Sequence, residues 1–391
     1  MLCRLSIDTD KPMFARPVAM ALLAKHPSRV ESHAIMGMVE AALQRADKAL
    51  PYLLKAQQMR PDWPLTLRVM CNVYVMLHEF DKAKEVAEKA LNHGDHYLPH
   101  VALGFYHLHN RNWKEGFKHY AHQMGRCADR NIQDYGLKPW QGKGKVLIYG
   151  EQGLGDQLAY TSCIDQRCGQ LVCHPKLGNL LARSVDIPVY GDQFAKEVRW
   201  PIECHYQASM SEAMIHQKVH RRGRWLVPHP EKTVQWGALM NASAKVKQRP
   251  WIGIAWSGGK VGSHSWLSRN LTEHDLAPIL ELNANFVSLE YRPHKAIPNV
   301  HSWPWATQTD DLDDFAALVD NLDAVVCVPT TAYHVAGGLG IPCHVIVHDR
   351  PHFHEGSDNA SPYWESVTLH HRRGGLEQVV QGIADKLARN L

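Results

Sequence analysis

The sequence predicts a helical repeat domain followed by two consecutive Rossmann-like α/β units. Three observations indicate this fold class. Apolar residues follow a helical period through residues 14–125, and small residues recur there at intervals of 34 positions. Beyond residue 145, short apolar runs alternate with helical segments, which is typical of parallel sheets with helical crossovers. Two of these runs, at 146–149 and 251–256, end in glycine-rich turns, so the α/β region divides into two units.

The repeat in the first third of the chain places small or apolar residues at matching positions. The matching pairs are Met36 with Met70, Gly37 with Cys71, Ala49 with Ala83, Leu53 with Ala87, and Ala56 with Ala90. Gly37, Ala49, Ala56 and Pro61 stand at consensus positions of the tetratricopeptide repeat, which this region resembles. Such stacks present a curved surface that binds peptides or other domains. A purely structural brace for the rest of the chain is the alternative interpretation.

Composition and charge exclude several classes of protein. The 43 basic and 39 acidic residues leave a formal charge of +4, which by itself does not predict nucleic-acid binding. No window contains the roughly 18 uninterrupted apolar residues that a membrane span needs. The first ten residues already carry charges, and the nine cysteines have no metal-ligand or paired spacing. We therefore expect a cytoplasmic protein with reduced thiols and no resident metal.

The α/β region is predicted in more detail from its apolar runs. The first unit has expected strands at 145–149, 170–173 and 188–190, with helices at 157–166, 176–184 and 209–216. The second unit has expected strands at 251–256, 285–289, 324–328 and 343–347, with helices at 273–282, 312–321 and 375–391. A connector rich in proline and glycine precedes the first of these strands. The predicted domains are residues 1–138, 139–245 and 246–391.

The turn at 150–157 leads from the first predicted strand into a helix. Such a turn gathers unpaired backbone N–H groups and the positive end of a helix dipole. Asp156 stands at its rim, where it would take a proton from a substrate hydroxyl. The alternative is that Asp156 only caps the helix. The other candidate residues of this acceptor-side turn are Glu151, Gly153, Gly155 and Gln157.

The second unit has two further turns at strand ends, at 257–260 and 329–338. The later one supplies hydroxyls from Thr330 and Thr331 at a helix start, which suits a pyrophosphate group. Arg269 is placed to add a cation, and Glu290 ends a strand where an acid would meet a ribose diol. Together these residues predict a site for a nucleotide diphosphate.

Several motifs occur in an order that resembles a known family. They are GEQGLGD at 150–156, GIAWSG at 253–258, SRNL at 268–271, FVSLE at 286–290, DDFAALVDNLDAVVCVPTTAYHVAGGLGIP at 313–342 and SPYW at 361–364. The chain resembles bacterial tetratricopeptide proteins fused to a glycosyltransferase domain of the ADP-heptose:lipopolysaccharide heptosyltransferase superfamily, which is glycosyltransferase family 9-like. This resemblance implies a GT-B fold, in which two Rossmann-like domains face each other across a cleft.

The resemblance also implies roles for single residues. Asp156 matches the aspartate that acts as general base, Glu290 the nucleoside contact, and either Arg269 or Lys260 the cation that faces the phosphates. The 330–338 turn matches the diphosphate-binding loop, with Thr330, Thr331, Ala332, His334 and Gly337 as its candidate residues, and Ser257 joins them among the donor-binding residues. Enzymes of this kind need no metal or other cofactor, because cations and backbone dipoles stabilise the departing nucleoside diphosphate.

Two departures from the family pattern concern the donor. Pro329 stands where the family has an Asp, and Tyr333 stands where it has an Ala. The family's acidic-aromatic stretch is replaced at 348–354 by a run that contains His348, His352 and His354. These histidines suggest a metal, but no carboxylate has a convincing spacing from them.

The predicted function is the transfer of a sugar from a nucleotide-diphosphate sugar to a hydroxyl acceptor, with inversion and without a metal. The acceptor would be a saccharide, a protein or another hydroxyl compound, and the repeats would bind a protein partner. The first alternative is a non-catalytic scaffold with a degenerate nucleotide-binding module. The second is glycosylation of a modified nucleic-acid base, with the basic segments 218–224 and 372–373 contacting phosphates.

Overall fold

A computed structural model of the chain describes residues 12–124, 132–195, 197–217, 223–259 and 269–390. Its contacts divide the chain into two units. Among the described residues, the helical unit comprises 12–124 and 350–356, and the α/β unit comprises the rest. The predicted boundary after residue 138 falls inside a short strand of the α/β unit, β1 (Lys138–Pro139).

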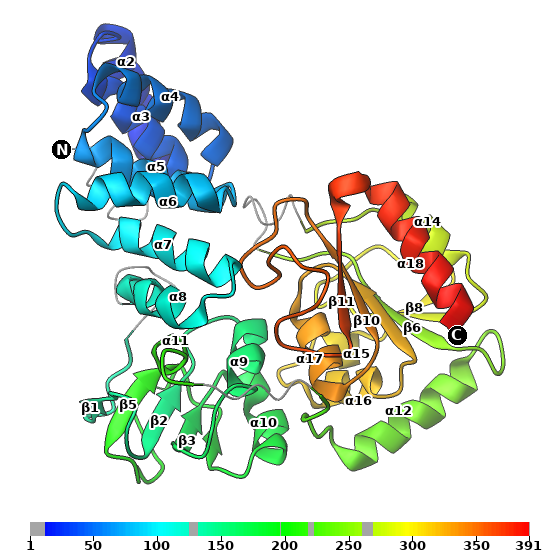
Figure 1. The fold of residues 1–391 in the computed structure, drawn as a ribbon. Coiled ribbons are helices and arrows are strands. Elements are labelled where there is room, and N and C mark those ends of the chain that lie inside the picture. Colours follow the sequence, from blue (N-terminus) through cyan, green and yellow to red (C-terminus); the bar gives the residue numbers. More distant parts are fainter. Residues whose placement is uncertain (1–11, 125–131, 196, 218–222, 260–268, 391) are drawn as a thin grey trace. The chain divides into compact units, whose positions relative to one another are not determined.

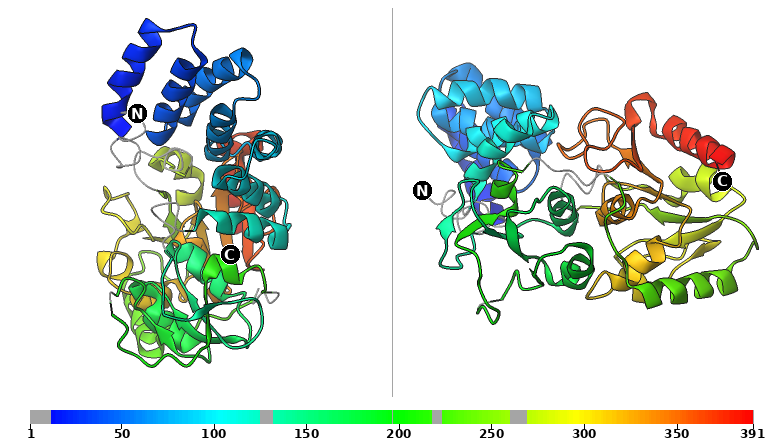
Figure 2. Two further views of the ribbon diagram at one scale, coloured as in Figure 1. Left: turned by 90° about the vertical axis from the view of Figure 1, so that its left-hand side faces the viewer. Right: turned by 60° about the horizontal axis from the view of Figure 1, so that its bottom comes forward.

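The helical unit consists of consecutive helices that pack in pairs (Figures 1 and 2). They are α2 (Pro12–Lys25), α3 (Val30–Ala42), α4 (Ala46–Met59), α5 (Pro64–Met76), α6 (Phe80–Leu91), α7 (Tyr97–His109) and α8 (Trp113–Tyr120), followed by a short 3-10 turn, η1 (Ala121–Gln123). The first helices of successive pairs begin at Val30, Pro64 and Tyr97, at intervals of 34 and 33 residues. The structure therefore confirms the helical region and the period of its pairs, and the resemblance to tetratricopeptide repeats stays a prediction.

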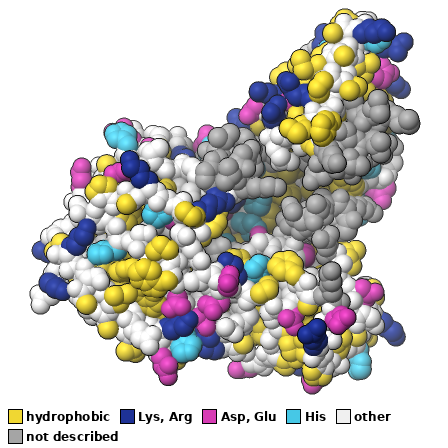
Figure 3. All heavy atoms as spheres, turned by 180° about the vertical axis from the view of Figure 1, so that it is seen from behind, with side chains coloured by type: hydrophobic (Ala, Val, Ile, Leu, Met, Phe, Trp, Pro, Cys, Tyr) yellow, Lys and Arg dark blue, Asp and Glu magenta, His cyan; other side chains and the backbone are white. Residues whose placement is uncertain are grey.

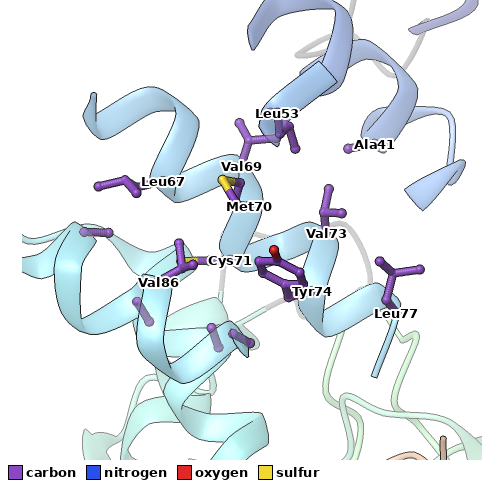
Figure 4. Packing of buried hydrophobic residues seen from close by; sticks show 14 of the residues in the cluster. Ala41, Leu53, Leu67, Val69, Met70, Cys71, Val73, Tyr74, Leu77 and Val86 are labelled. Atoms are coloured by element: carbon purple, nitrogen blue, oxygen red, sulfur yellow. The ribbon is translucent and has the colours of Figure 1, made fainter. Parts of the chain in front are cut away.

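Small residues allow the helices of a pair to cross closely. A Cβ atom on Gly37 of α3 would lie 2.6 Å from the Leu53 side chain of α4. Figure 4 shows how the apolar side chains of α5, such as Met70 and Val73, lie among those of the neighbouring helices. The first described helix, α2, exposes apolar side chains, including Phe14. Figure 3 shows hydrophobic side chains gathered at the α2 end of the helical unit.

The first sheet of the α/β unit has the strand order β1-β5-β2-β3-β4, and every pairing is parallel. Its further elements are β2 (Val146–Tyr149), α9 (Leu154–Thr161), β3 (Cys168–Val172), η2 (Pro175–Leu177), α10 (Gly178–Ser184), β4 (Val189–Tyr190), β5 (Tyr206–Ser209) and α11 (Met210–Ala213). Strands β3 and β4 follow β2 in the chain and lie in order on one side of it, whereas the next strand, β5, pairs with the other side of β2. The strand order therefore reverses between β2 and β5.

The second sheet has the order β11-β10-β9-β6-β7-β8, again all parallel. Its strands are β6 (Trp251–Ala255), β7 (Asn285–Ser288), β8 (Val300–His301), β9 (Ala324–Cys327), β10 (Cys343–Val347) and β11 (Val367–His371). Its helical elements are α12 (Pro230–Ser243), α14 (Glu273–Leu280), α15 (Pro304–Thr307), α16 (Asp313–Val319), α17 (Thr331–Leu339), η3 (Arg372–Gly374) and α18 (Leu376–Asn390). This is the strand order of a doubly wound Rossmann sheet, which reverses between β6 and β9.

Helices cover the second sheet on both sides. Leu276 and Ile279 of α14 join Val380 and Ile383 of α18 in one apolar cluster with the sheet, and Figure 1 shows these two helices together on one side of the strands. In a second group of helices, α16 contacts both α12 and α17. The predicted Rossmann-like units are thus present, each built on a parallel sheet.

A half-buried histidine pair lies on two neighbouring strands of the second sheet. His344 Nδ1 on β10 lies 3.0 Å from His370 Nε2 on β11. Burial, with the positive charge of Lys386 on α18, lowers the pKa of His344 to about 4. Burial lowers the pKa of His370 to about 3, helped by His344, Lys386 and His371.

We therefore expect the protein to lose stability as the pH falls from 6.5 toward 3. In that window the unfolded chain, whose histidines titrate near 6.5, binds more protons than the folded chain. The melting temperature should be several degrees lower at pH 4.5 than at pH 7. The double variant His344→Leu/His370→Leu should show a smaller difference between the two pH values. The exposed His93→Gln is the control. An unchanged pH dependence in the double variant would assign the acid sensitivity to other groups.

Candidate functional site

A cavity of about 380 Å³ opens at the carboxyl ends of β6, β7 and β9. Ala255 ends β6, Leu289 follows β7, and residues 330–332 lead from β9 into α17. The cavity thus lies where the strand order of the second sheet reverses, which is the usual ligand position in such sheets. Its lining residues are Leu154, Lys176, Ala255, Leu289, Tyr291, Thr307, Gln308, Thr309, Leu312, Phe315, Thr330, Thr331 and Ala332.

The start of α17 contributes a hydroxyl and a helix dipole to this cavity. Thr330 is the N-cap residue, and its Oγ1 accepts a hydrogen bond of 3.3 Å from the backbone N–H of Ala332. Because the lining includes residues 330–332, the positive end of the α17 dipole faces the cavity. An anionic group bound here would meet backbone N–H groups and a favourable potential.

Arg269 lies beside the two turns that meet at this point. A Cβ atom on Gly258, in the turn after β6, would lie 3.0 Å from the Pro329 carbonyl oxygen and 3.5 Å from the Cβ of Arg269. The Arg269 guanidinium is 3.5 Å from the same Pro329 oxygen. The structure therefore brings Arg269 to the turn that precedes Thr330, as predicted. Lys260, the other predicted cation, lies outside the described residues.

Glu290 holds the turn after β6. It is buried, and its carboxylate accepts hydrogen bonds from the backbone N–H groups of Trp256 (2.6 Å) and Ser257 (2.7 Å) and from the Ser257 hydroxyl. Its neighbours Leu289 and Tyr291 line the cavity. Both Glu290 and Ser257 thus have a structural role, and the nucleoside and diphosphate contacts predicted for them stay predictions.

The first turn of α9 reaches the same cavity from the first sheet. Leu154 lines the cavity, and Asp156, two residues further on, is half-buried. The Asp156 carboxylate accepts a hydrogen bond of 3.1 Å from the N–H of Gly153, so Asp156 does cap the helix. A Cβ atom on Gly155 would lie 2.7 Å from the His334 ring of α17. The turns predicted to bind acceptor and donor therefore pack directly against each other.

Three other predicted residues build the site without lining the cavity. The buried carboxylate of Glu151 accepts hydrogen bonds from the N–H groups of Met210 (3.1 Å) and Ser211 (3.2 Å) and from the Ser211 hydroxyl, where the first sheet reverses its order. Gln157 is fully buried and accepts a 2.9 Å bond from the N–H of His174. Gly337 lies about two turns into α17, near the end of the segment 329–338, and it does not line the cavity. There, a Cβ atom would lie 2.3 Å from Trp364, so packing against Trp364 explains this glycine.

Several lining residues carry no sequence signal. Residues 307–309 and Leu312 come from the end of α15 and the connection into α16, which has no motif, whereas Phe315 belongs to α16 and to the motif at 313–342. Lys176, from the first sheet, donates a hydrogen bond of 2.6 Å to the Thr309 carbonyl. Burial raises the pKa of Tyr291, and the Arg292 guanidinium lies 4.6 Å from its ring centre. The sequence therefore predicts the turns that border the cavity, but not the residues that form the rest of its lining.

The histidine run at 348–354 makes local contacts, and most of the basic segment at 218–224 lies outside the described residues. Among the described residues, no group of three or more His, Cys, Asp or Glu side chains could hold a metal ion, and His348 Nδ1 instead pairs with Asp349 at 2.6 Å. Of the basic segments, residues 218–222 lie outside the described ranges, and Arg224 pairs with Asp320 at 2.7 Å. Figure 3 shows basic and acidic side chains interspersed over one face. No helix in the described part is long and apolar enough to cross a membrane.

Solved glycosyltransferases show distant structural similarity to the chain. A glycosyl transferase of family 9 from Veillonella parvula is 12% identical, with a TM-score of 0.43, and the match covers 65% of this chain and 99% of that one. The E. coli ADP-heptose lps heptosyltransferase II is 12% identical, with a TM-score of 0.40, over 63% of this chain and 98% of that one. A mutant O-GlcNAc transferase of Thermobaculum terrenum is 12% identical, with a TM-score of 0.37, over 97% and 88%.

No family model matches the sequence, and no curated protein matches it either. The structural similarities are too distant to assign an activity. The residues around the cavity are therefore the basis for inferring a function.

Proposed function

We propose that this protein is a glycosyltransferase that moves a sugar from a nucleotide-diphosphate sugar to a hydroxyl acceptor. One observation carries the proposal. The cavity combines the N-terminus of α17, with the Arg269 cation beside its first turn, and the first turn of α9, which bears Asp156. The turn of the proposed anion site and the helical turn that bears the proposed base thus come from two different sheets, and both contribute residues to the lining of one cavity.

The cavity walls suit the parts of such a donor. Leu289, Leu312 and Phe315 give an apolar wall against which a nucleobase would pack. The hydroxyls of Thr330 and Thr331 and the dipole of α17 would bind the diphosphate. Because these groups supply positive potential without a metal, we propose metal-independent transfer.

Asp156 would act as the general base. It would accept the proton of the acceptor hydroxyl as that oxygen attacks the anomeric carbon, while the bond from that carbon to the diphosphate breaks. The electrons of that bond leave with the nucleoside diphosphate, whose growing charge Arg269 and α17 would stabilise. Attack from the face opposite the leaving group inverts the configuration at the anomeric carbon.

The first test is binding of nucleoside diphosphates measured by calorimetry over a panel of bases. We expect one of them to bind, and Arg269→Ala to weaken its binding about tenfold, since a charged hydrogen bond contributes about 1.5–3 kcal/mol. Arg373→Ala is the control, because Arg373 contacts the Ser357 carbonyl on the exposed surface. Release of the same nucleoside diphosphate from its sugar conjugate, with an acceptor present, then tests transfer.

A non-catalytic scaffold is the second candidate function. The capping bond between Asp156 and the Gly153 N–H favours it, because that bond alone accounts for an aspartate at this position. Binding of no nucleoside diphosphate by the intact protein would favour the scaffold over the transferase.

A further inference from the structure

Lys176 is the only charged residue among the described residues that line the cavity. The other described lining residues are apolar or uncharged, and none of them is Asp or Glu. Lys176 comes from η2, which follows β3 of the first sheet, whereas the start of α17 belongs to the second sheet. Arg269 lies beside the turn before Thr330, but it is not among the lining residues. The first sheet therefore supplies a cation to the wall of the cavity.

The backbone of Lys176 is fixed by hydrogen bonds to two other segments. Its N–H donates a 3.1 Å bond to Nδ1 of His174, whose own N–H donates a 2.9 Å bond to the Gln157 side chain of α9. Its carbonyl accepts a 3.0 Å bond from the N–H of Leu312, in the connection between α15 and α16. Lys176 is thus tied both to the helix that bears Asp156 and to a segment of the second sheet that lines the cavity.

The ammonium group of Lys176 is held in place by an uncharged partner. Its Nζ donates a 2.6 Å hydrogen bond to the Thr309 carbonyl, and within the described part of the chain it forms no ion pair. An ammonium has three N–H donors, so the bond to Thr309 leaves donors for an anion. Because the side chain is half-buried and already fixed at its tip, an anion would meet a weakly screened charge and would immobilise little that is free.

We propose that Lys176 binds the diphosphate of the donor, as a cation that the first sheet contributes to the anion site at the start of α17. Lys176 and α17 would then contact the same diphosphate from elements of two different sheets. As the bond to the anomeric carbon breaks, the ammonium would stabilise the negative charge that grows on the departing group. This inference rests on the proposed function for the identity of the donor, and it means that the complete anion site needs both sheets.

The competing interpretation is that Lys176 only ties two segments together through the Thr309 carbonyl. The two roles differ in what they require of the side chain. A tie needs a hydrogen-bond donor, whereas an anion site needs a positive charge. Glutamine keeps a donor and loses the charge, and arginine keeps both. Lys176→Gln and Lys176→Arg therefore separate the anion site from the tie.

The test is calorimetry of the intact protein with a nucleoside diphosphate and with its parent nucleoside. Lys176→Gln should weaken binding of the nucleoside diphosphate about tenfold, because a charge-assisted hydrogen bond is lost, and it should leave nucleoside binding unchanged. Lys176→Arg should retain most of the affinity. Lys247→Gln is the matched control, because the Lys247 ammonium also donates to a carbonyl, that of Asn241 at 2.8 Å, on the exposed surface. Equal weakening of both ligands in Lys176→Gln, or weakening of neither, would overturn the proposal.

A second measurement on the unaltered protein keeps the test decisive if Lys176→Gln does not fold. Inorganic pyrophosphate should slow reductive methylation of Lys176, measured by mass spectrometry of the digested protein, and should not slow that of Lys247. Unchanged methylation of Lys176 throughout a pyrophosphate titration would overturn the proposal. If no nucleoside diphosphate binds, the proposed function fails, and protection by pyrophosphate still decides whether Lys176 belongs to an anion site. If a nucleoside diphosphate binds equally well to Lys176→Gln, the proposed function stands and this inference fails.

Discussion

Replacing Asp156 with Asn should slow sugar transfer about 10³-fold, because a general base contributes about 10²–10⁴ to the rate. Nucleoside diphosphate binding and the melting temperature should change little. The amide oxygen of Asn can still accept the hydrogen bond from the Gly153 N–H, so the helix keeps its cap. The substitution therefore separates the catalytic interpretation of Asp156 from the capping one.

A matched control is available in α14. Asp275 stands at the same helix position as Asp156, and its carboxylate accepts a 2.7 Å hydrogen bond from the N–H of the N-cap residue Thr272. Asp275→Asn should leave the transfer rate unchanged. The measurement is the initial rate of nucleoside diphosphate release with saturating donor and acceptor. Full activity in Asp156→Asn would show that the base assignment is wrong.

Replacing Gly155 with Ala should both destabilise the protein and impair transfer. The added methyl carbon would lie 2.7 Å from the His334 ring, which is buried and has its centre 3.8 Å from that of the Tyr333 ring. Because that ring has little room to move, α9 must shift away from α17, at a cost of about 1–3 kcal/mol. The shift also moves Asp156, and a displacement of about 1 Å can cost about 10²-fold in rate.

The control for this substitution is Gly382→Ala in α18. No atom lies within 4 Å of a Cβ at Gly382, so alanine should raise stability by about 0.5–1 kcal/mol through helix propensity. Urea unfolding measures the first effect in both variants, and donor turnover measures the second. If Gly155→Ala has wild-type stability and activity, the close contact between α9 and α17 does not govern the site.

Much of the fold could be predicted because buried parallel strands read as apolar runs. β10 lies where the sequence predicts it, and β6, β7 and β9 lie within one residue at each end. β5 was missed because its residues, Tyr206–Ser209, alternate polar and apolar groups, although it lies between β1 and β2 inside its sheet. α12 was missed because only Trp236 and Met240 of its residues are buried, which leaves no clear helical period. β8 and β11, which lie at the edges of the second sheet, were also missed.

The candidate site was predictable only where local chain geometry determines it. Turns at strand ends can be read locally, so the neighbourhood of Arg269, Thr330 and Asp156 could be located. What Glu151 and Glu290 bind depends on segments about 59 and 34 residues away, and no spacing reveals such pairings. The contact between the rings of Phe353 and Phe105 is even harder to predict, because these two residues are very far apart in the sequence. Such contacts are determined by tertiary structure, which local sequence patterns do not encode.

The two buried glutamates already bind backbone N–H groups at the points where the two sheets reverse their strand order. At the reversal point of the first sheet, Glu151 already supplies an anion to the N–H groups of Met210 and Ser211. A phosphate approaching there would meet a carboxylate, whereas a neutral sugar hydroxyl would meet only a hydrogen-bond acceptor. In the second sheet, Glu290 occupies the turn after β6, so an incoming diphosphate is left with the start of α17. For the proposed transferase, this arrangement would favour an uncharged acceptor beside the first sheet and an anionic donor at the start of α17.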